Sequence, residues 1–156
     1  LVEFFDYQCG YCKRMTPVID TLLKNNKNLK VVLKERPIFG GTSTTAAEAA
    51  LAVYQLDPKQ YEAFHKAIIS KKGKLTKEEI MAAASELNIN TSKLEKIMNS
   101  KQVQDELQQT DALSTALGFS GTPAFVLANG SLTKFEVIGG ASSAEVLQQK
   151  LNDLQS

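Results

Sequence analysis

The two cysteines of this 156-residue chain lie three positions apart, in the run Cys9-Gly10-Tyr11-Cys12. A bridge between them closes a very short loop and adds little stability to a fold. Redox chemistry explains the spacing better, because one thiolate can attack a disulfide while the second thiol resolves the mixed disulfide. We expect Cys9 to be the attacking thiolate and Cys12 the resolving thiol, with no cofactor required.

Other uses of a cysteine pair fit less well. Zinc usually takes four ligands, and the chain has no second cysteine pair and one histidine, His65. A cysteine hydrolase needs a paired base. Because His65 lies one helical turn after Tyr61, a surface histidine or a hydrogen-bonded core histidine is favoured over a ligand or a base. We predict no metal site, and an inert disulfide in a chaperone or binding module stays open as a different class of function.

The elements around the pair can place it for this chemistry. Residues 1–5 form an apolar run whose one charge is Glu3, which is typical of a buried central strand. From residue 10 to about residue 26, apolar residues recur at helical spacing. Cys9 therefore opens a helix, where free backbone N–H groups and the positive end of the helix dipole stabilise a thiolate.

The rest of the chain predicts an α/β fold. We expect a strand at 29–35, a helical block at 42–111, a hairpin of strands 124–128 and 134–138 around Asn129-Gly130, and a last helix capped by Ser142 or Ser143. The first strand–helix–strand unit is a parallel crossover, and the end is an antiparallel hairpin with a helix.

Two capping boxes are predicted inside the helical block. Thr45 with Glu48 and Thr76 with Glu79 both have the required spacing. Gly118 is expected to end the last helix before the hairpin.

The composition is that of an ordinary soluble globular domain, with 43% apolar residues, 22% charged residues and a net charge of +1. This balance argues against a broad basic surface for nucleic acid or anionic lipid. No apolar run approaches the ~20 residues that cross a bilayer. No signal peptide is visible, but the chain opens directly on a strand, so we expect further residues upstream of Leu1.

Four sequence features together resemble the thioredoxin superfamily, and more closely its DsbA-like branch. They are the run Val2–Lys13, the proline inside the first helix at Pro17, the loop Gly121–Phe125 and the strand end Val137–Gly140. The resemblance implies a thioredoxin fold whose βαβ and ββα halves are separated by an inserted helical subdomain. The thioredoxin-like domain would comprise residues 1–41 and 112–156, with the N-terminal strand missing, and the insertion residues 42–111.

The resemblance also implies roles for residues outside the cysteine pair. Pro123 should be a cis proline beside Cys9, which leaves the Thr122 backbone free to pair with an extended substrate. Glu3 should be a buried acid that takes a proton from Cys12 during resolution. The simpler alternatives are a trans turn proline and a partly exposed acid at a strand edge. On the next predicted strand, Lys34 and Glu35 are further candidates for the same electrostatic field.

The active-site dipeptide departs from the DsbA type, which has Pro-His there. Gly10-Tyr11, with Thr122 before the proline, resembles the active site of DsbC-type isomerases. The resemblance thus implies an isomerase-leaning disulfide oxidoreductase of the periplasm or bacterial cell envelope, with a DsbA-type dithiol oxidase as the alternative. A glutathione-transferase relative on the same scaffold fits poorly, because such relatives typically lack the intact pair.

The same resemblance implies the partners. Unfolded or misoxidised secreted proteins are the expected substrates, with a membrane redox partner of DsbB or DsbD type. A homo-oligomer is possible through an upstream region, and no nucleic acid is expected.

Overall fold

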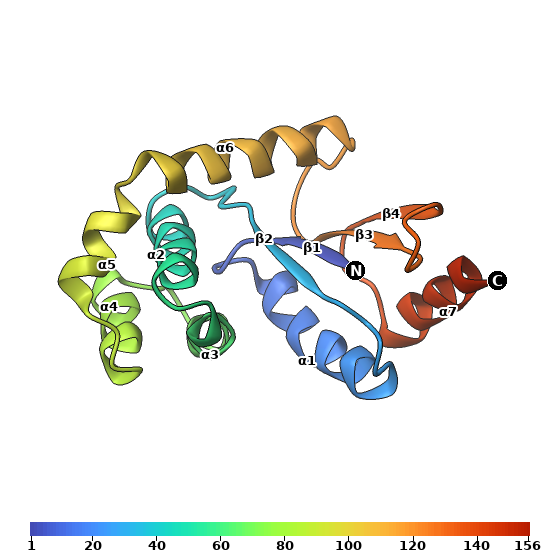
Figure 1. Ribbon diagram of the computed structural model, residues 1–156, viewed down its shortest axis with the longest axis horizontal. Coiled ribbons are helices and arrows are strands. Elements are labelled where there is room, and N and C mark those ends of the chain that lie inside the picture. The colour runs from blue at the N-terminus through green and yellow to red at the C-terminus, as the bar shows by residue number, and fades with distance from the viewer.

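A four-stranded mixed sheet forms the centre of the molecule. The computed structural model describes residues 1–156, and its strands follow the order β2-β1-β3-β4 (Figure 1). The strands are β1 (Val2–Phe5), β2 (Val32–Glu35), β3 (Ala124–Ala128) and β4 (Phe135–Gly139). β1 pairs in parallel with β2 and antiparallel with β3, and β3 pairs antiparallel with β4. This is the mixed α/β arrangement of a thioredoxin fold, as the sequence predicted.

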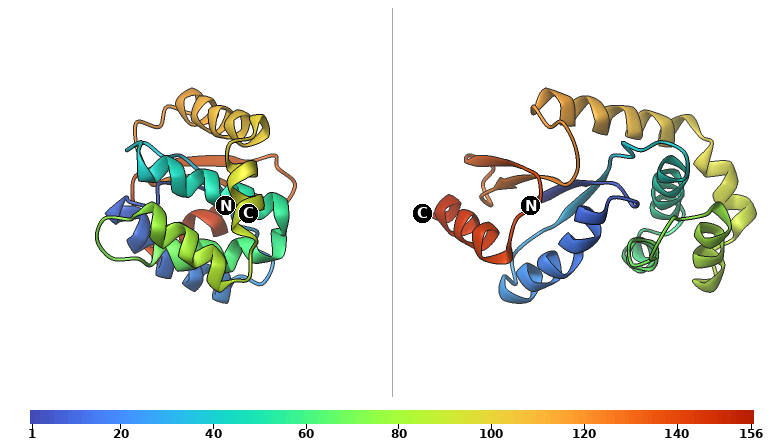
Figure 2. Two further views of the ribbon diagram at one scale, coloured as in Figure 1. Left: turned by 90° about the vertical axis from the view of Figure 1, so that its left-hand side faces the viewer. Right: turned by 180° about the vertical axis from the view of Figure 1, so that it is seen from behind.

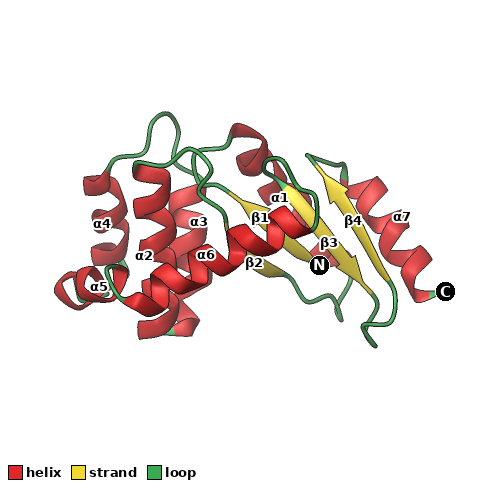
Figure 3. Cartoon of the chain, turned by 90° about the horizontal axis from the view of Figure 1, so that it is seen from above, coloured by secondary structure: helices red, strands yellow, loops and turns green.

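Seven α-helices and one short 3-10 helix surround the sheet. They are α1 (Gly10–Asn25), α2 (Thr42–Leu56), η1 (Pro58–Gln60), α3 (Tyr61–Ile69), α4 (Lys77–Glu86), α5 (Thr91–Met98), α6 (Lys101–Ala116) and α7 (Ala144–Gln155). The sheet lies between α6 on one face and α1 with α7 on the other (Figure 2). Seen from above, α6 crosses over the β1–β2 side of the sheet, while α2 to α5 gather beyond it (Figure 3). No helix is both long and apolar enough to cross a membrane.

The two larger of three apolar clusters hold the layers together. In one, Met15, Ile19 and Leu22 of α1 pack with residues of β3 and α7. In the other, both cysteines belong to the same buried cluster as Phe64 and Ile68 of α3. The cysteine segment is therefore buried against the helices that follow β2, not only against the sheet.

Several predicted boundaries shift. β2 begins at Val32, three residues later than predicted. The predicted hairpin is present, with its second strand at 135–139 instead of 134–138, so the connection is six residues long, 129–134. The Asn129 side chain accepts hydrogen bonds from the backbone N–H groups of Thr133 and Lys134 at 2.9 and 3.0 Å. This side chain closes a wider loop than its dipeptide signal suggests.

One capping box is confirmed and the other is wrong. Thr76 and Glu79 form a complete reciprocal box at the start of α4. α2 begins at Thr42, so Thr45 already lies in its first turn and donates to the Gly41 carbonyl oxygen. The helix starts earlier because Gly41 adopts a φ of 51°, which turns the chain into α2 without a side-chain cap. Ser143 caps α7, and Gly118, at φ 81°, follows the end of α6.

Candidate active site

Cys9 is the N-cap residue of α1. Its Sγ accepts a hydrogen bond from the Cys12 backbone N–H at 3.3 Å, which satisfies one of the free donors at the helix start. Both cysteines are free thiols and both are buried, Cys9 at 6% exposure and Cys12 at 1%. Between them, Gly10 and Tyr11 lie on the surface, with Tyr11 60% exposed. The more accessible sulfur thus belongs to the cysteine that was predicted to attack.

The two thiols perturb each other in opposite directions. The hydrogen bond with Cys12 is the largest influence on Cys9 and, with backbone N–H groups, lowers the pKa of Cys9 to about 6 despite burial. The same hydrogen bond, followed by burial, raises the pKa of Cys12 far above its usual range. At neutral pH the pair therefore holds one thiolate, at Cys9, and one protonated thiol, at Cys12.

The loop before β3 lies against the Cys9 sulfur. The peptide bond between Thr122 and Pro123 is cis, and the Cys9 thiol is 3.5 Å from the Thr122 carbonyl oxygen, to which it donates. The Thr122 hydroxyl is buried without a hydrogen-bond partner, and the Thr122 side chain is one of the influences that lower the pKa of Cys9. Neither backbone group of Thr122 takes part in a backbone–backbone hydrogen bond. The loop therefore offers one free amide and one free hydroxyl beside the sulfur.

Glu3 lies in the interior strand of the sheet. β1 is flanked by β2 and β3, and Glu3 is buried, at 5% exposure. Burial, and secondarily the negative charge of Cys9, raises the pKa of Glu3 to about 8. The structure thus contradicts the alternative of a partly exposed acid at a strand edge.

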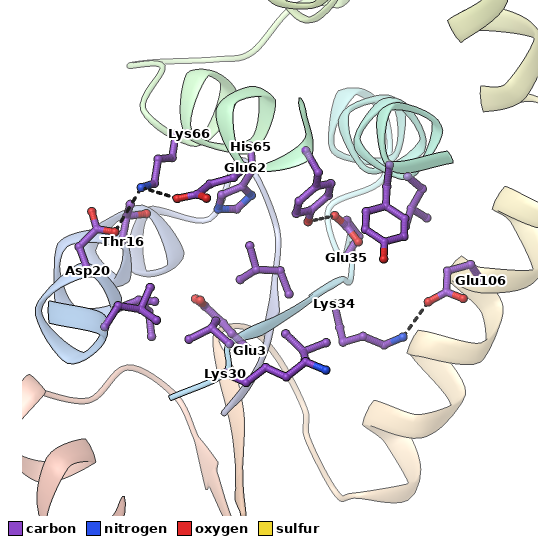
Figure 4. A pocket seen from close by; sticks show the side chains of 18 of the residues that line it. Glu3, Thr16, Asp20, Lys30, Lys34, Glu35, Glu62, His65, Lys66 and Glu106 are labelled. Carbon is purple, nitrogen blue, oxygen red and sulfur yellow. Dashed lines mark hydrogen bonds and ion pairs between the residues drawn. The ribbon is translucent and has the colours of Figure 1, made fainter. Parts of the chain in front are cut away.

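A groove gives this carboxyl a route to water. It has a volume of about 1080 Å³ and runs along β2 between α1 and α3, with Glu3, Glu35 and His65 among its lining residues (Figure 4). Burial raises the pKa of Glu35 to about 7, and Glu35 accepts a hydrogen bond from the Tyr61 hydroxyl. Lys34 pairs instead with Glu106 of α6 at 2.7 Å. Both further candidates on β2, Lys34 and Glu35, therefore line the groove together with Glu3, and Lys34 is also held by an ion pair.

His65 is a buried core residue. Its Nδ1 lies 2.9 Å from the Tyr7 hydroxyl, and burial lowers its pKa to about 4. This matches the predicted hydrogen-bonded core histidine. No group of three or more His, Cys, Asp or Glu side chains is placed to hold a metal ion.

The sequence analysis missed Asp6. Its buried carboxylate accepts hydrogen bonds from the Gln8 backbone N–H at 2.7 Å, the Ser43 hydroxyl at 2.7 Å and the Phe39 backbone N–H at 3.2 Å. Its backbone carbonyl accepts from the Cys9 N–H at 3.1 Å. The only local signal was an acidic residue just before the cysteine pair, because two of the three partners lie more than 30 residues away.

A thioredoxin-type sheet, a dithiol at the start of α1 and a cis-proline loop against the first sulfur define a protein of dithiol–disulfide exchange. The chain belongs to the family of DSBA-like thioredoxin domains, whose model matches residues 1–152. It is a thiol–disulfide oxidoreductase.

Known relatives agree in sequence and in structure. The thiol:disulfide interchange protein DsbA of Bordetella parapertussis is 27% identical over 154 residues, covering 95% of this chain and 71% of that protein. A thioredoxin-like oxidoreductase from Silicibacter pomeroyi is 34% identical with a TM-score of 0.85, covering 97% of this chain and 83% of that one. A periplasmic thioredoxin-like protein from Salmonella enterica serovar Typhimurium is 26% identical with a TM-score of 0.86, covering 99% and 83%.

Proposed function

We propose that this protein forms or rearranges disulfides in secreted polypeptides, with a leaning towards isomerisation. The observation that carries the proposal is the asymmetric pair: a Cys9 sulfur at the helix start with a pKa of about 6, beside a buried Cys12 that keeps its proton. Such a pair presents one nucleophile to the substrate and holds the second in reserve.

The exchange proceeds through a mixed disulfide. The Cys9 thiolate attacks one sulfur of a substrate disulfide, which forms a Cys9–substrate bond and releases the other substrate sulfur as a thiolate. In isomerisation, a different thiolate of the substrate attacks the substrate sulfur of the mixed disulfide, which forms a new substrate disulfide and regenerates the Cys9 thiolate. In reduction, Cys12 loses its proton and attacks Cys9, which yields the enzyme disulfide and a second substrate thiol. Oxidation of a substrate dithiol is the reverse sequence.

Glu3 is the group proposed to move the Cys12 proton. Its pKa of about 8 allows it to exchange protons near neutral pH, and the negative charge of Cys9 contributes to that value. Proton transfer to the groove beside β2 would return the carboxyl to its starting state.

Thr122 and Pro123 are proposed to dock the substrate. The Thr122 backbone makes no hydrogen bond with the chain's own backbone, so an extended substrate can pair with it as an added strand. The hydroxyl of Thr122 would donate to Cys9 when that sulfur is a thiolate. Gly10 and Tyr11 leave the sulfur without a cationic neighbour between the cysteines, in contrast to a DsbA-type Pro-His, which supports the isomerase leaning.

Two activities measured side by side test this proposal. We expect the full-length protein to reactivate scrambled ribonuclease in a glutathione buffer and also to oxidise reduced ribonuclease, more slowly. Cys9→Ser should abolish both activities, whereas Cys12→Ser should keep part of the isomerase activity, because rearrangement can finish without Cys12. Oxidation without reactivation would favour the dithiol oxidase.

The inert-disulfide alternative has its own measurement. Titration in glutathione buffers should give a reduction potential well above the roughly −300 mV that marks structural disulfides. A lower potential, with no exchange of any substrate, would favour a binding module.

The proposal includes a place and partners. The Salmonella relative is described as periplasmic, which supports the periplasm or cell envelope. A membrane protein of DsbB or DsbD type would set the redox state of the pair, and the full-length protein would self-associate if it is an isomerase of the DsbC kind. In this scheme residues 42–111 form a helical subdomain inserted into a thioredoxin-like domain of residues 1–41 and 112–156. The mass of the full-length protein in solution checks self-association.

A further inference from the structure

The loop between α3 and α4 is tied to the residues that flank the two cysteines. The Lys13 ammonium donates to the carbonyl oxygens of Ile69 and Lys71, at 3.3 and 2.6 Å. The Gln8 side-chain oxygen accepts from the Leu75 backbone N–H at 3.2 Å. Both ends of the loop are therefore fixed beside the start of α1, and the two segments lie next to each other in the left view of Figure 2.

This attachment holds the lysines of the loop beside the start of α1, the helix that Cys9 caps. We call the five side chains the basic rim: Lys13 and Arg14 from α1, and Lys71, Lys72 and Lys74 from the loop. Three of them, Arg14, Lys72 and Lys74, are exposed, and the other two are half-buried. The Arg14 guanidinium lies 4.4 Å from the centre of the Tyr11 ring. Its Nη1 lies 3.7 Å from the position that a Cβ atom on residue 10 would occupy.

No acid forms an ion pair with the basic rim. All seven ion pairs of the molecule involve other cations. The loop carries no acidic residue, and the carboxylate of Asp6, which faces this region, is buried. On α4, Glu79 is engaged in the capping box and Glu78 is exposed on the first turn. The net charge of the whole chain is only +1, so this local cluster, and not the overall charge, would attract an acidic partner.

We infer that the basic rim selects substrates, favouring cysteines that are flanked by acidic residues in an extended polypeptide. The inference rests on the proposed function, because it concerns the same sulfur. Exposed cations add little to affinity pair by pair, but an unpaired cluster beside the reacting atom accelerates the encounter with an oppositely charged partner. A polypeptide is the occupant because Cys9, at the same helix start, contacts the Thr122 carbonyl of the loop proposed to dock an extended substrate, and because a net charge of +1 gives the whole chain little attraction to an anionic membrane.

Three matched peptides test the preference. Each carries one cysteine in a mixed disulfide with the same chromophoric thiol and differs only in the flanking residues, two Asp, two Ser or two Lys. Each rate constant for reaction with reduced enzyme is divided by that for reaction with dithiothreitol, which removes differences in intrinsic reactivity. At low salt we expect the Asp peptide to react at least about fivefold faster than the Lys peptide, and the ratio to collapse near 0.5 M salt.

Two double variants test whether the rate ratio of the Asp and Lys peptides depends on the basic rim. Lys72→Glu/Lys74→Glu should reverse or abolish the ratio, since both positions are exposed and their replacement leaves the core intact. Lys24→Glu/Lys27→Glu makes the same charge change at exposed positions at the far end of α1 and should leave the ratio as it is.

The outcomes separate this inference from the proposed function. If all three peptides react at equal normalised rates, or if the rim variant keeps the wild-type ratio, the rim does not select substrates although the enzyme exchanges disulfides. If no peptide reacts, the proposed function fails as well. Equal peptide rates together with rim-dependent binding to anionic phosphatidylglycerol vesicles would assign the rim to a membrane instead and overturn the inference.

Discussion

The largest stabilising influence on the Cys9 thiolate is the side chain of Cys12, and the start of the helix ranks below it. Sequence reasoning placed the sulfur at a helix start and relied on backbone N–H groups. Those groups do contribute, but the hydrogen bond from Cys12 is the larger cause of the low pKa. The resolving thiol is therefore also the group that activates its partner.

Two substitutions of Cys12 separate these effects. Cys12→Ala removes the donor, so the pKa of Cys9 should rise by at least about one unit, whereas Cys12→Ser keeps a hydroxyl donor and should leave it within about half a unit. Absorbance of the thiolate at 240 nm against pH measures both values. Equal values for the two variants would mean that the helix start alone sets the pKa.

Glu3 should make the fold less stable as pH rises. Its pKa is about 8 in the folded protein and about 4.5 in the unfolded chain, so the folded state binds more protons between these values. Stability is lost as pH rises through that window. Glu3→Gln should therefore be more stable than the wild type by on the order of 3 kcal/mol at pH 8, with no difference near pH 4.

Urea unfolding of the reduced protein at both pH values measures this difference. A catalytic role predicts in addition that Glu3→Gln slows formation of the Cys9–Cys12 disulfide from the mixed disulfide. A stability difference without a change in that rate would leave Glu3 as a buried acid with no part in proton transfer.

At the scale of elements, the spacing of apolar residues along the sequence predicted most of the helices and strands. It located the buried first strand, the amphipathic α1, the hairpin and α7, because each of these buries one continuous face. It also placed Cys9 at a helix start. Contacts between distant elements had no such local signature. The Asp6 hydrogen bonds and the attachment of the α3–α4 loop through Lys13 depend on how the helical block lies against α1, which no short window of sequence contains.

The two capping predictions offer a direct comparison within one molecule. Thr76→Ala removes a cap that accepts from the Glu79 N–H at 3.2 Å, and should cost about 1 kcal/mol of unfolding free energy. Thr45→Ala removes a hydroxyl that only donates to a carbonyl one turn earlier, and should cost less than about 0.5 kcal/mol. Denaturant unfolding of both variants under the same conditions measures the two losses of unfolding free energy. Equal losses would contradict the assignment of the α2 start to Gly41.

At the scale of the whole molecule, the helical block and the sheet meet at the catalytic pair. The buried cluster that contains Cys9 and Cys12 continues into α2, α3, α4 and α5. The groove beside β2 opens where α1 and α3 both face the sheet edge. Chemistry at the sulfurs is therefore coupled to the stability of both parts of the chain.

This coupling predicts that the reduced protein is more stable than the oxidised one, and increasingly so as pH rises. The reduced fold holds a thiol with a pKa of about 6, against about 8.5 in an unfolded chain, whereas the oxidised fold has no thiol to ionise. A lowered pKa stabilises the fold at high pH, and this contribution is lost as pH falls through about 6. The loop entropy that the disulfide removes from the unfolded chain does not depend on pH. It therefore changes the stability difference between the two redox forms by a constant amount.

The change of this stability difference with pH has an upper limit. Between about pH 6 and pH 8 the reduced form should gain at most about 1.4 kcal/mol per pH unit over the oxidised form, less the screening by water at the open mouth of the site. The negative charge of Cys9, which helps to raise the pKa of Glu3, exists only in the reduced form, so the slope should be shallower below about pH 8 in the wild type than in Glu3→Gln. Thermal unfolding of both redox forms from pH 5 to pH 8.5 measures it. A difference that does not vary with pH would mean that Cys9 is not a thiolate in the folded protein, and the asymmetric pair would lose its physical basis.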